Sequence, residues 1–298
     1  MIFTGLSAFP LTPITSSGID EKGFSTILSR ITSAGADSIG VLGSTGSYAY
    51  LTRQQRKQVA TFAKAQAGDI PIMVCIGTIS TEEVIRLADD AQQSGADALL
   101  LPPVSYQKLN EDEVFGLFET VVHHASVPVC IYDNPGTTHF TFSDELYGRI
   151  AALKGIGSIK IPGVPADPHQ AQARVQSLRD RLPAHVTVGV SGDAFAGTGL
   201  NAGCDIWYSV CGGLFPHTAK EITLAAGRGE HEKVTELTAR LEPLWALFRK
   251  HGSSIRVMAG AAGVLGLTDS DCLPRPLMPL SAEHLAEIKT VIDTLDLH

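Results

Sequence analysis

One pattern recurs along this chain and limits its possible folds more than any other feature. It appears in SAGADSIGVLG (33–43), QSGADALLLPP (93–103) and NAGCDIWYSVCG (201–212). Each segment places a glycine, a small residue and an aspartate before an apolar run, and each follows an amphipathic stretch. Glycine is common just after a helix, where φ is positive, and a short apolar run is typical of a buried parallel strand. The repeated unit is therefore a helix followed by a strand.

Applied along the chain, this unit predicts eight strands. They cover residues 3–9, 38–43, 72–77, 98–102, 129–133, 157–161, 186–191 and 206–211. Helical patterns with capping residues and acidic first turns lie between them, for example at 80–95 and 109–125. Such alternation predicts an α/β fold of the (β/α)₈ TIM-barrel type. A doubly wound open sheet is the competing fold, but the GSTG turn after the second strand lacks its GxGxxG fingerprint.

The rest of the chain, 225–298, has helical periodicity and no low-complexity linker before it. We therefore expect a barrel over 1–224 and a C-terminal helical extension over 225–298, packed on that barrel.

Composition excludes several classes of partner. The formal net charge of −8 argues against nucleic acid or an anionic membrane surface. We see no signal-peptide pattern and no apolar run of about 18 residues that would span a membrane. The five cysteines are far apart without a CxxC pair, which favours buried free thiols in a cytoplasmic protein.

In such barrels the functional groups lie at the carboxyl ends of the strands and in the loops that follow. In chain order, these ends supply Ser44, Thr45, Tyr106, Tyr132, Thr137, His139, Lys160, Asp193 and Ser209 as candidate site residues.

Lys160 is the unusual member of this set, because it interrupts an apolar strand. Side chains alternate along a strand, so Ile159 and Ile161 would face the helices and Lys160 the barrel interior. A desolvated amine has a lowered pKa, and a neutral lysine attacks ketones to form a Schiff base. A solvated lysine on an edge strand is the alternative.

The other strand ends fit the same chemistry. Tyr132 and Tyr106 supply phenols, which can shuttle protons during imine formation and the later carbon–carbon step. Ser44 and Thr45 offer hydroxyls and backbone N–H groups on a glycine-flanked turn, suited to a small carboxylate. Each feature alone has a simpler explanation, but together they predict one pocket for Schiff-base chemistry.

The chain resembles the dihydrodipicolinate synthase and N-acetylneuraminate lyase family of class I aldolases over essentially its whole length. The matching segments are FPLTP, GSTG, LLPPVSYQKLNEDEVF, YDNPGT, SIKIPG and VSGD. The resemblance implies a lyase that performs reversible aldol cleavage or condensation. Its substrates would be pyruvate or a related 2-oxo acid and an unknown aldehyde or sugar acid.

The resemblance also implies a role for individual residues. Lys160 would form the Schiff base, Tyr132 would relay protons, and Ser44 would belong to that relay. Tyr106 would reach the site across a tight-dimer interface, and Ser44 with Thr45 would bind the C1 carboxylate. The family implies a homo-oligomer, either a dimer or a tetramer, and no metal or organic cofactor.

Four positions depart from the family pattern. Thr137 stands where true dihydrodipicolinate synthases carry an arginine that grips a second substrate carboxylate, and a hydroxyl does not replace a bidentate guanidinium. Asp133 replaces a common asparagine, Ser47 a glutamate, and Ile161 a polar residue. These changes disfavour 4-hydroxy-tetrahydrodipicolinate synthase activity and predict a different, less acidic second substrate.

Several alternatives remain open at this point. The same imine could serve a dehydratase acting on a 2-oxo-3-deoxy sugar acid. A metal-dependent barrel enzyme needs clustered ligands at strand ends, which the ten histidines do not supply. A barrel that only binds a keto acid is the non-enzymatic alternative.

Three outlying candidates each have two interpretations. His139 would contact the distal end of the substrate or lie in a surface loop. Asp193 and Ser209 would bind substrate hydroxyls, unless Asp193 caps the helix that follows it.

Overall fold

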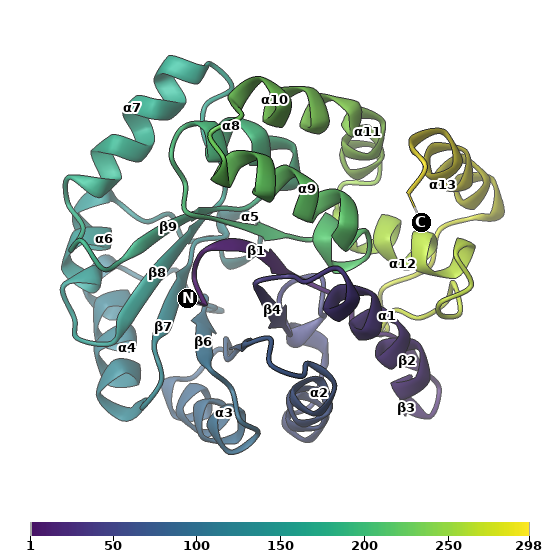
Figure 1. The fold of residues 1–298 in the computed structure, drawn as a ribbon. Coiled ribbons are helices and arrows are strands. Elements are labelled where there is room, and N and C mark those ends of the chain that lie inside the picture. Colours follow the sequence, from purple (N-terminus) through teal and green to yellow (C-terminus); the bar gives the residue numbers. More distant parts are fainter. Residues whose placement is uncertain (1, 298) are drawn as a thin grey trace.

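The computed structural model describes residues 2–297, which contain a closed barrel of eight parallel strands (Figure 1). The barrel strands are β1 (Gly5–Ala8), β4 (Ser38–Val41), β5 (Ile72–Cys75), β6 (Ala98–Leu101), β7 (Val129–Tyr132), β8 (Ile156–Ile161), β9 (Thr187–Val190) and β10 (Ile206–Ser209). Each predicted segment supplies one of these strands, apart from small differences at their ends, so the predicted TIM barrel is confirmed. A short hairpin of β2 (Ile14–Thr15) and β3 (Gly18–Ile19), outside the barrel, was not predicted.

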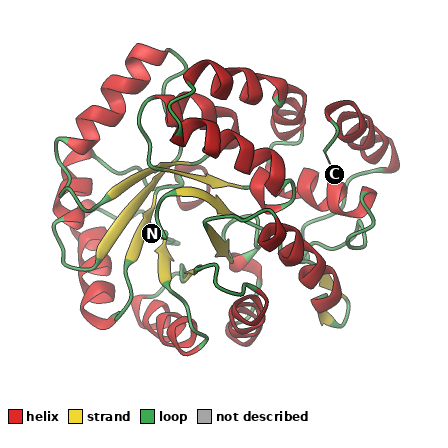
Figure 2. Ribbon diagram, viewed as in Figure 1, coloured by secondary structure: helices red, strands yellow, loops and turns green. Residues whose placement is uncertain are grey.

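Helices follow the strands and surround the barrel (Figure 2). The outer helices are α1 (Glu21–Ser33), α2 (Arg53–Gln66), α3 (Thr81–Gln93), α4 (Glu111–His124), α6 (Asp144–Ala151), α7 (Pro168–Arg179), α8 (Ala196–Asn201) and α9 (Pro216–Gly227). Short turns of helix follow four strands, namely η1 (Tyr48–Tyr50), α5 (Pro135–Thr138), η2 (Asp193–Phe195) and η3 (Cys211–Gly213).

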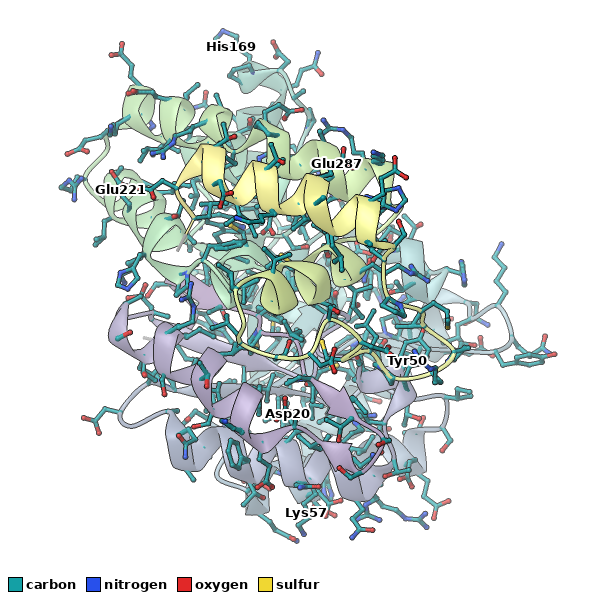
Figure 3. The ribbon with its side chains drawn as sticks, turned by 90° about the vertical axis from the view of Figure 1, so that its right-hand side faces the viewer. Asp20, Tyr50, Lys57, His169, Glu221 and Glu287 are labelled. Atoms are coloured by element: carbon teal, nitrogen blue, oxygen red, sulfur yellow. The ribbon has the colours of Figure 1, made fainter. Side chains whose placement is uncertain are left out.

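The C-terminal segment continues as α10 (His231–Arg240), α11 (Glu242–Lys250), α12 (Ser254–Val264) and α13 (Ala282–Leu295). Helix α10 packs on α8 and α9, while α11, α12 and α13 pack on one another. Figure 3 shows α13, in yellow, on the outer face of the molecule. The expected boundary after residue 224 falls inside α9. Across the described helices, none combines the length and the apolar character that a membrane span requires.

The three repeated aspartates make the same contacts at the amino ends of the strands. Each carboxylate accepts one hydrogen bond from a backbone N–H of the neighbouring strand and one from a cationic side chain of a helix. These sets are Asp37 with Leu6 and Lys220, Asp97 with Ile72 and Lys64, and Asp205 with Val188 and Arg179, at 2.6 to 2.9 Å. The preceding glycines, Gly35, Gly95 and Gly203, have the positive φ that the pattern predicted. The repeat therefore ends a helix and ties the next strand to its neighbour.

The first strand closes the barrel. Strand β1 pairs in parallel with β10 on one side and with β4 on the other. Gly5 lies opposite Ile206, and Ser7 lies opposite Ser38. Closure of the barrel therefore pairs its first strand in the sequence with its last.

All five cysteines are buried and free, as the sequence indicated.

Candidate active site

Lys160 lies near the carboxyl end of β8, and its side chain lines a cavity of about 370 Å³, which we call the Lys160 cavity. The residue is only 5% exposed. Its Nζ lies 4.5 Å from the ring centroid of Tyr132, 5.1 Å from that of Phe9 and 5.6 Å from that of Tyr208. Among the described residues no carboxylate forms an ion pair with it. The amine is thus surrounded by aromatic rings and faces the cavity.

Burial lowers the pKa of the Lys160 amine to about 8, while the nearby Cys130, Asp193 and Cys75 act in the opposite direction. The two thiols are neutral at pH 7, because burial raises the pKa of Cys75 and of Cys130 to about 11. Of these three groups, Asp193 is therefore the one that opposes the lowering of the amine's pKa at neutral pH. A useful fraction of the amine is unprotonated near pH 7, and that form attacks a carbonyl.

Tyr132, Ser44 and Asn134 form a closed set of hydrogen bonds beside the amine. The Tyr132 hydroxyl lies 3.1 Å from Ser44 Oγ, and Asn134 Nδ2 donates to Tyr132 Oη at 3.0 Å and to Ser44 Oγ at 3.1 Å. Burial raises the pKa of Tyr132 to about 12, against the effect of the hydrogen bonds from Ser44 and Asn134. The phenol is therefore protonated at rest, with two donors in place to stabilise a transient phenolate.

The turn after β4 has an unusual backbone conformation and exposes backbone N–H groups. Leu42 and Ser47 both have positive φ, 59° and 62°, in a region that non-glycine residues rarely occupy. A Cβ on Gly46 would lie 2.8 Å from the Leu42 nitrogen, so this position needs glycine. No backbone carbonyl of the described chain accepts from the N–H of Ser44 or Thr45. Both groups are therefore open to a carboxylate in the cavity.

The Asp193 carboxylate accepts hydrogen bonds from residues of β10 and of the loop that follows it. Its Oδ1 accepts from Trp207 Nε1 at 2.9 Å, and from Ser209 Oγ and the Val210 N–H at 3.2 Å each. Its Oδ2 accepts from the Cys211 N–H at 2.7 Å. Burial raises the pKa of Asp193 to about 6. The carboxylate joins the β9 and β10 loops, so the alternative prediction that it caps a helix was wrong.

Known proteins are similar to this chain in sequence and in fold. A sequence model described as the Dihydrodipicolinate synthetase family matches residues 2–295. The chain belongs to this family. A 4-hydroxy-tetrahydrodipicolinate synthase of Bartonella quintana (strain Toulouse) is 30% identical over 279 residues, which are 91% of this chain and 90% of the relative.

Two further relatives extend the comparison within the dihydrodipicolinate synthetase family. Escherichia coli (strain K12) YagE, for which 2-dehydro-3-deoxy-D-gluconate aldolase activity is proposed, is 25% identical over 99% of this chain and 98% of its own. The crystal structure of a dihydrodipicolinate synthase from Agrobacterium tumefaciens str. C58 has a TM-score of 0.93 at 42% identity, covering 99% of this chain and 98% of that one. The protein is an enzyme, a lyase of the aldolase type that this family contains.

Most of the predicted site residues of this family member meet in one place. The Lys160 cavity is lined by Lys160, Tyr132, Ser44, Thr45, Thr137 and Asp193. Ser209 is fully buried and donates to Asp193, so its hydroxyl is not presented to the cavity. Its expected contact with a substrate hydroxyl therefore stays a prediction that this placement does not support.

Tyr106 and His139 lie elsewhere on the chain. Both line a separate cavity of about 270 Å³, and Tyr106 is 86% exposed. His139 follows the short helix α5 with positive φ, and it lines this separate cavity and not the Lys160 cavity. A role of His139 at the distal end of the substrate, and of Tyr106 in a partner's site, stay predictions.

A second cavity, of about 470 Å³, adjoins the first. The two share Ser44, Thr45, Thr137, Ser253 and Ser254 in their walls. Helix α12 begins at this shared wall, so the C-terminal segment contributes to the site as well as to the surface.

Sequence reasoning missed three residues around the amine. Phe9 and Tyr208 contact Lys160 through their rings, and Asn134 bonds Tyr132 and Ser44. Phe9 is the last residue of the first predicted strand, 3–9, and carries no group that the predicted chemistry requires. Asn134 stands two residues after Tyr132 in YDNPGT, and its place after a strand was the available signal. Within residues 2–297, no three His, Cys, Asp or Glu side chains gather as a metal-binding group.

Proposed function

We propose that this lyase forms a Schiff base between Lys160 and pyruvate or a related 2-oxo acid, and then cleaves or makes a carbon–carbon bond. One observation carries the proposal: a buried amine with a pKa of about 8 shares a cavity with a hydrogen-bonded tyrosine. A lysine in an apolar interior destabilises the fold, and its retention is explained by the use of its neutral form.

The first step is attack by Lys160 Nζ on the substrate's C2 carbonyl, which gives a carbinolamine. Its hydroxyl leaves as water with the proton of Tyr132, which produces an iminium ion and a phenolate. The N–H of Asn134 and the hydroxyl of Ser44 stabilise that phenolate. Thr45 and Ser44 supply open N–H groups for the C1 carboxylate.

Cleavage follows from the same pair of groups. The Tyr132 phenolate takes the proton of the C4 hydroxyl, the C3–C4 bond breaks, and its electrons pass to the iminium as an enamine. An aldehyde leaves, the enamine gains a proton at C3, and water then releases the 2-oxo acid from Lys160. The reverse sequence is an aldol condensation, so one set of residues serves both directions.

Thr137 bears on the identity of the second substrate. It lines both cavities without a charge, where the family's synthases were expected to carry an arginine. We therefore leave condensation with aspartate semialdehyde out of the proposal. A dehydratase acting on a 2-oxo-3-deoxy sugar acid would use the same first step.

We also propose a homo-oligomer, a dimer or a tetramer, in the cytoplasm. The tyrosine side chain at 106 is almost fully exposed, as expected for a residue that completes a neighbouring site. Light scattering after size exclusion tests this, and Tyr106→Phe should lower turnover only in the assembled form.

Borohydride trapping with pyruvate tests the central proposal. The expected product is a reduced adduct on Lys160, detected by intact mass and peptide mapping. Lys160→Arg should give none, because a guanidinium stays protonated. The exposed Lys154 on the preceding turn offers a matched control, and Lys154→Arg should be trapped like the native protein.

The outcomes separate the remaining alternatives. An adduct with longer 2-oxo acids but none with pyruvate favours the dehydratase. No adduct with any 2-oxo acid rejects the Schiff-base proposal and leaves a barrel that only binds.

A further inference from the structure

The second cavity allows a substrate to extend well beyond the ketone. Its walls include Tyr50 and Leu277 besides the residues shared with the Lys160 cavity. Figure 3 labels Tyr50 beside the loop that precedes α13. A chain held at Lys160 by its C2 atom can therefore run past Thr137 into a space of about 470 Å³.

Arg256 is a guanidinium without a partner in this second cavity. It lies in the first turn of α12 and is partly buried between the buried Ile255 and Val257. Within residues 2–297 Arg256 has neither a hydrogen bond nor an ion pair, whereas every other arginine donates to an acceptor. Arginine has five donors, and Arg256 directs none of them to an acceptor in the described part of the chain.

Helix stability does not explain this residue. The first turn of a helix carries the positive end of the macrodipole, where a cation is unfavourable. Helices α3 and α4 follow the usual preference, with acidic residues in their first turns. Helix α12 has Arg256 in its first turn and no acidic residue there; α2 likewise begins with Arg53, but that guanidinium is paired with Asp90. A ligand of opposite charge would make this placement favourable.

The charges of the two cavities point to a carboxylate. Lys160 and Arg256 are the cationic residues in their described walls, and Asp193 is the acidic one. Both Asp193 oxygens are already bonded within the protein. Ser254 lines both cavities, and its hydroxyl has no partner among the described residues. One guanidinium with one hydroxyl balances one carboxylate, whereas a phosphate dianion would keep an unpaired charge.

We propose that Arg256, assisted by Ser254, binds a second carboxylate at the end of the substrate far from the ketone, which makes 2-oxo diacids the preferred substrate class. This inference rests on the proposed Schiff-base function for the position of the ketone. It moves the distal anion site from Thr137, on the β7 loop, to the first turn of α12. The expectation of a less acidic second substrate is thereby reversed.

The first test measures binding without chemistry. Calorimetric titration compares adipate with hexanoate, which has a similar length and only one carboxylate. We expect adipate to bind about 10- to 100-fold more tightly, as for a charge-assisted hydrogen-bonded pair. Arg256→Gln should abolish this preference and Arg256→Lys should keep part of it. Arg181→Gln, an exposed arginine bonded to Ser177 on another face, serves as the control and should change nothing.

The second test repeats the comparison on the imine. Borohydride trapping with 2-oxoadipate, 2-oxohexanoate and pyruvate gives a half-saturating concentration for each. Arg256→Gln should raise the value for 2-oxoadipate by about 10-fold or more and leave the other two unchanged. Equal shifts for all three would assign Arg256 to the fold rather than to specificity.

The two tests fail separately. Adipate that binds no better than hexanoate, or not at all, overturns the role of Arg256 even if pyruvate is trapped. The absence of any trapped imine rejects the Schiff-base function, while an Arg256-dependent preference for adipate would still establish the carboxylate site.

Discussion

The two ends of the barrel differ in whether their charged side chains are paired. At the amino end, Asp37, Asp97 and Asp205 are each matched by a cation and a backbone N–H. At the carboxyl end, Lys160 is surrounded by aromatic rings and forms no ion pair among the described residues, and Arg256 has no partner among them either.

This difference separates what holds the fold from what performs chemistry. Paired charges at the amino end lower the free energy of the folded state, and none of these residues lines the Lys160 cavity or the second cavity. The Lys160 amine at the carboxyl end is desolvated, which raises the free energy of the folded state at neutral pH. Substitutions at the amino end should therefore lower stability and leave kcat unchanged, whereas removal of the Lys160 amine should raise stability and abolish activity.

The largest effect is expected from Lys160→Met. Without an amine no imine forms, so steady-state turnover of any 2-oxo acid should fall below about 10⁻⁴ of the native rate. Far-ultraviolet circular dichroism should remain native. Activity above this level would remove Lys160 from the mechanism and erase the distinction between the two ends.

Tyr132→Phe should slow turnover by about 10² to 10⁴-fold, since it removes one acid–base group. The ring remains to pack against Lys160, so the unfolding midpoint should change little. Single-turnover trapping should place the loss in imine formation and in the subsequent carbon–carbon step. An unaltered rate would reassign Tyr132 to packing.

The same Lys160→Met variant should be more stable than the native protein at pH 7, by up to about 3 kcal/mol. Below pH 8 both folded and unfolded lysine carry the proton, and the folded state bears the full cost of burial. Between pH 8 and 10.5 only the unfolded state stays protonated, so native stability rises and the advantage of methionine shrinks. Urea unfolding at pH 7 and pH 10 measures this, and an equal gain at both would show that packing is the cause.

At the amino end, Asp205→Ala should lower the free energy of unfolding by about 1–3 kcal/mol, because the Val188 N–H loses its acceptor and Arg179 keeps only the Gly203 carbonyl. The kcat of the remaining folded enzyme should be unchanged. A fall in kcat at constant folded fraction would mean that the two ends are coupled.

The smallest effect is expected from Arg179→Gln, at about 0–1 kcal/mol. The Arg179–Asp205 pair is partly solvated on both sides, and such pairs contribute little. Its comparison with Asp205→Ala in chemical unfolding separates the carboxylate's bond to the backbone from its bond to the guanidinium. Equal losses in the two variants would make the ion pair the dominant interaction.

Most elements at the amino end of the barrel could be predicted from the sequence. Glycine at positive φ and an apolar run are local features, so the helix ends and all barrel strands could be located from the pattern around residues such as Gly95. Lys160 was also found this way, because a lysine inside a buried strand contradicts its surroundings. The aspartate of each repeat was noticed, but its bonds to a neighbouring strand were not predicted.

The carboxyl end was predictable only in part, because its contacts join distant segments. Asp193 accepts hydrogen bonds from residues 207–211, and the sequence around Asp193 does not predict those donors. The hydrogen bond from Asn134 to Ser44 depends on the turn after β4, which is distant in the sequence. Arg256 lies in an ordinary helical pattern, and its importance appears only when α12 meets the cavity wall.

The closure of the barrel by β1 has a consequence for the newborn chain. Roughly 200 residues separate Gly5 from its partner Ile206, which a ribosome makes in about 10 to 40 s. Phe9 follows β1 and Tyr208 lies in β10, so the aromatic surroundings of Lys160 are complete only after β10 has been made and paired. Until then the burial that lowers the pKa of the Lys160 amine is incomplete, so the reactive amine that we propose is expected only after the last strand has paired.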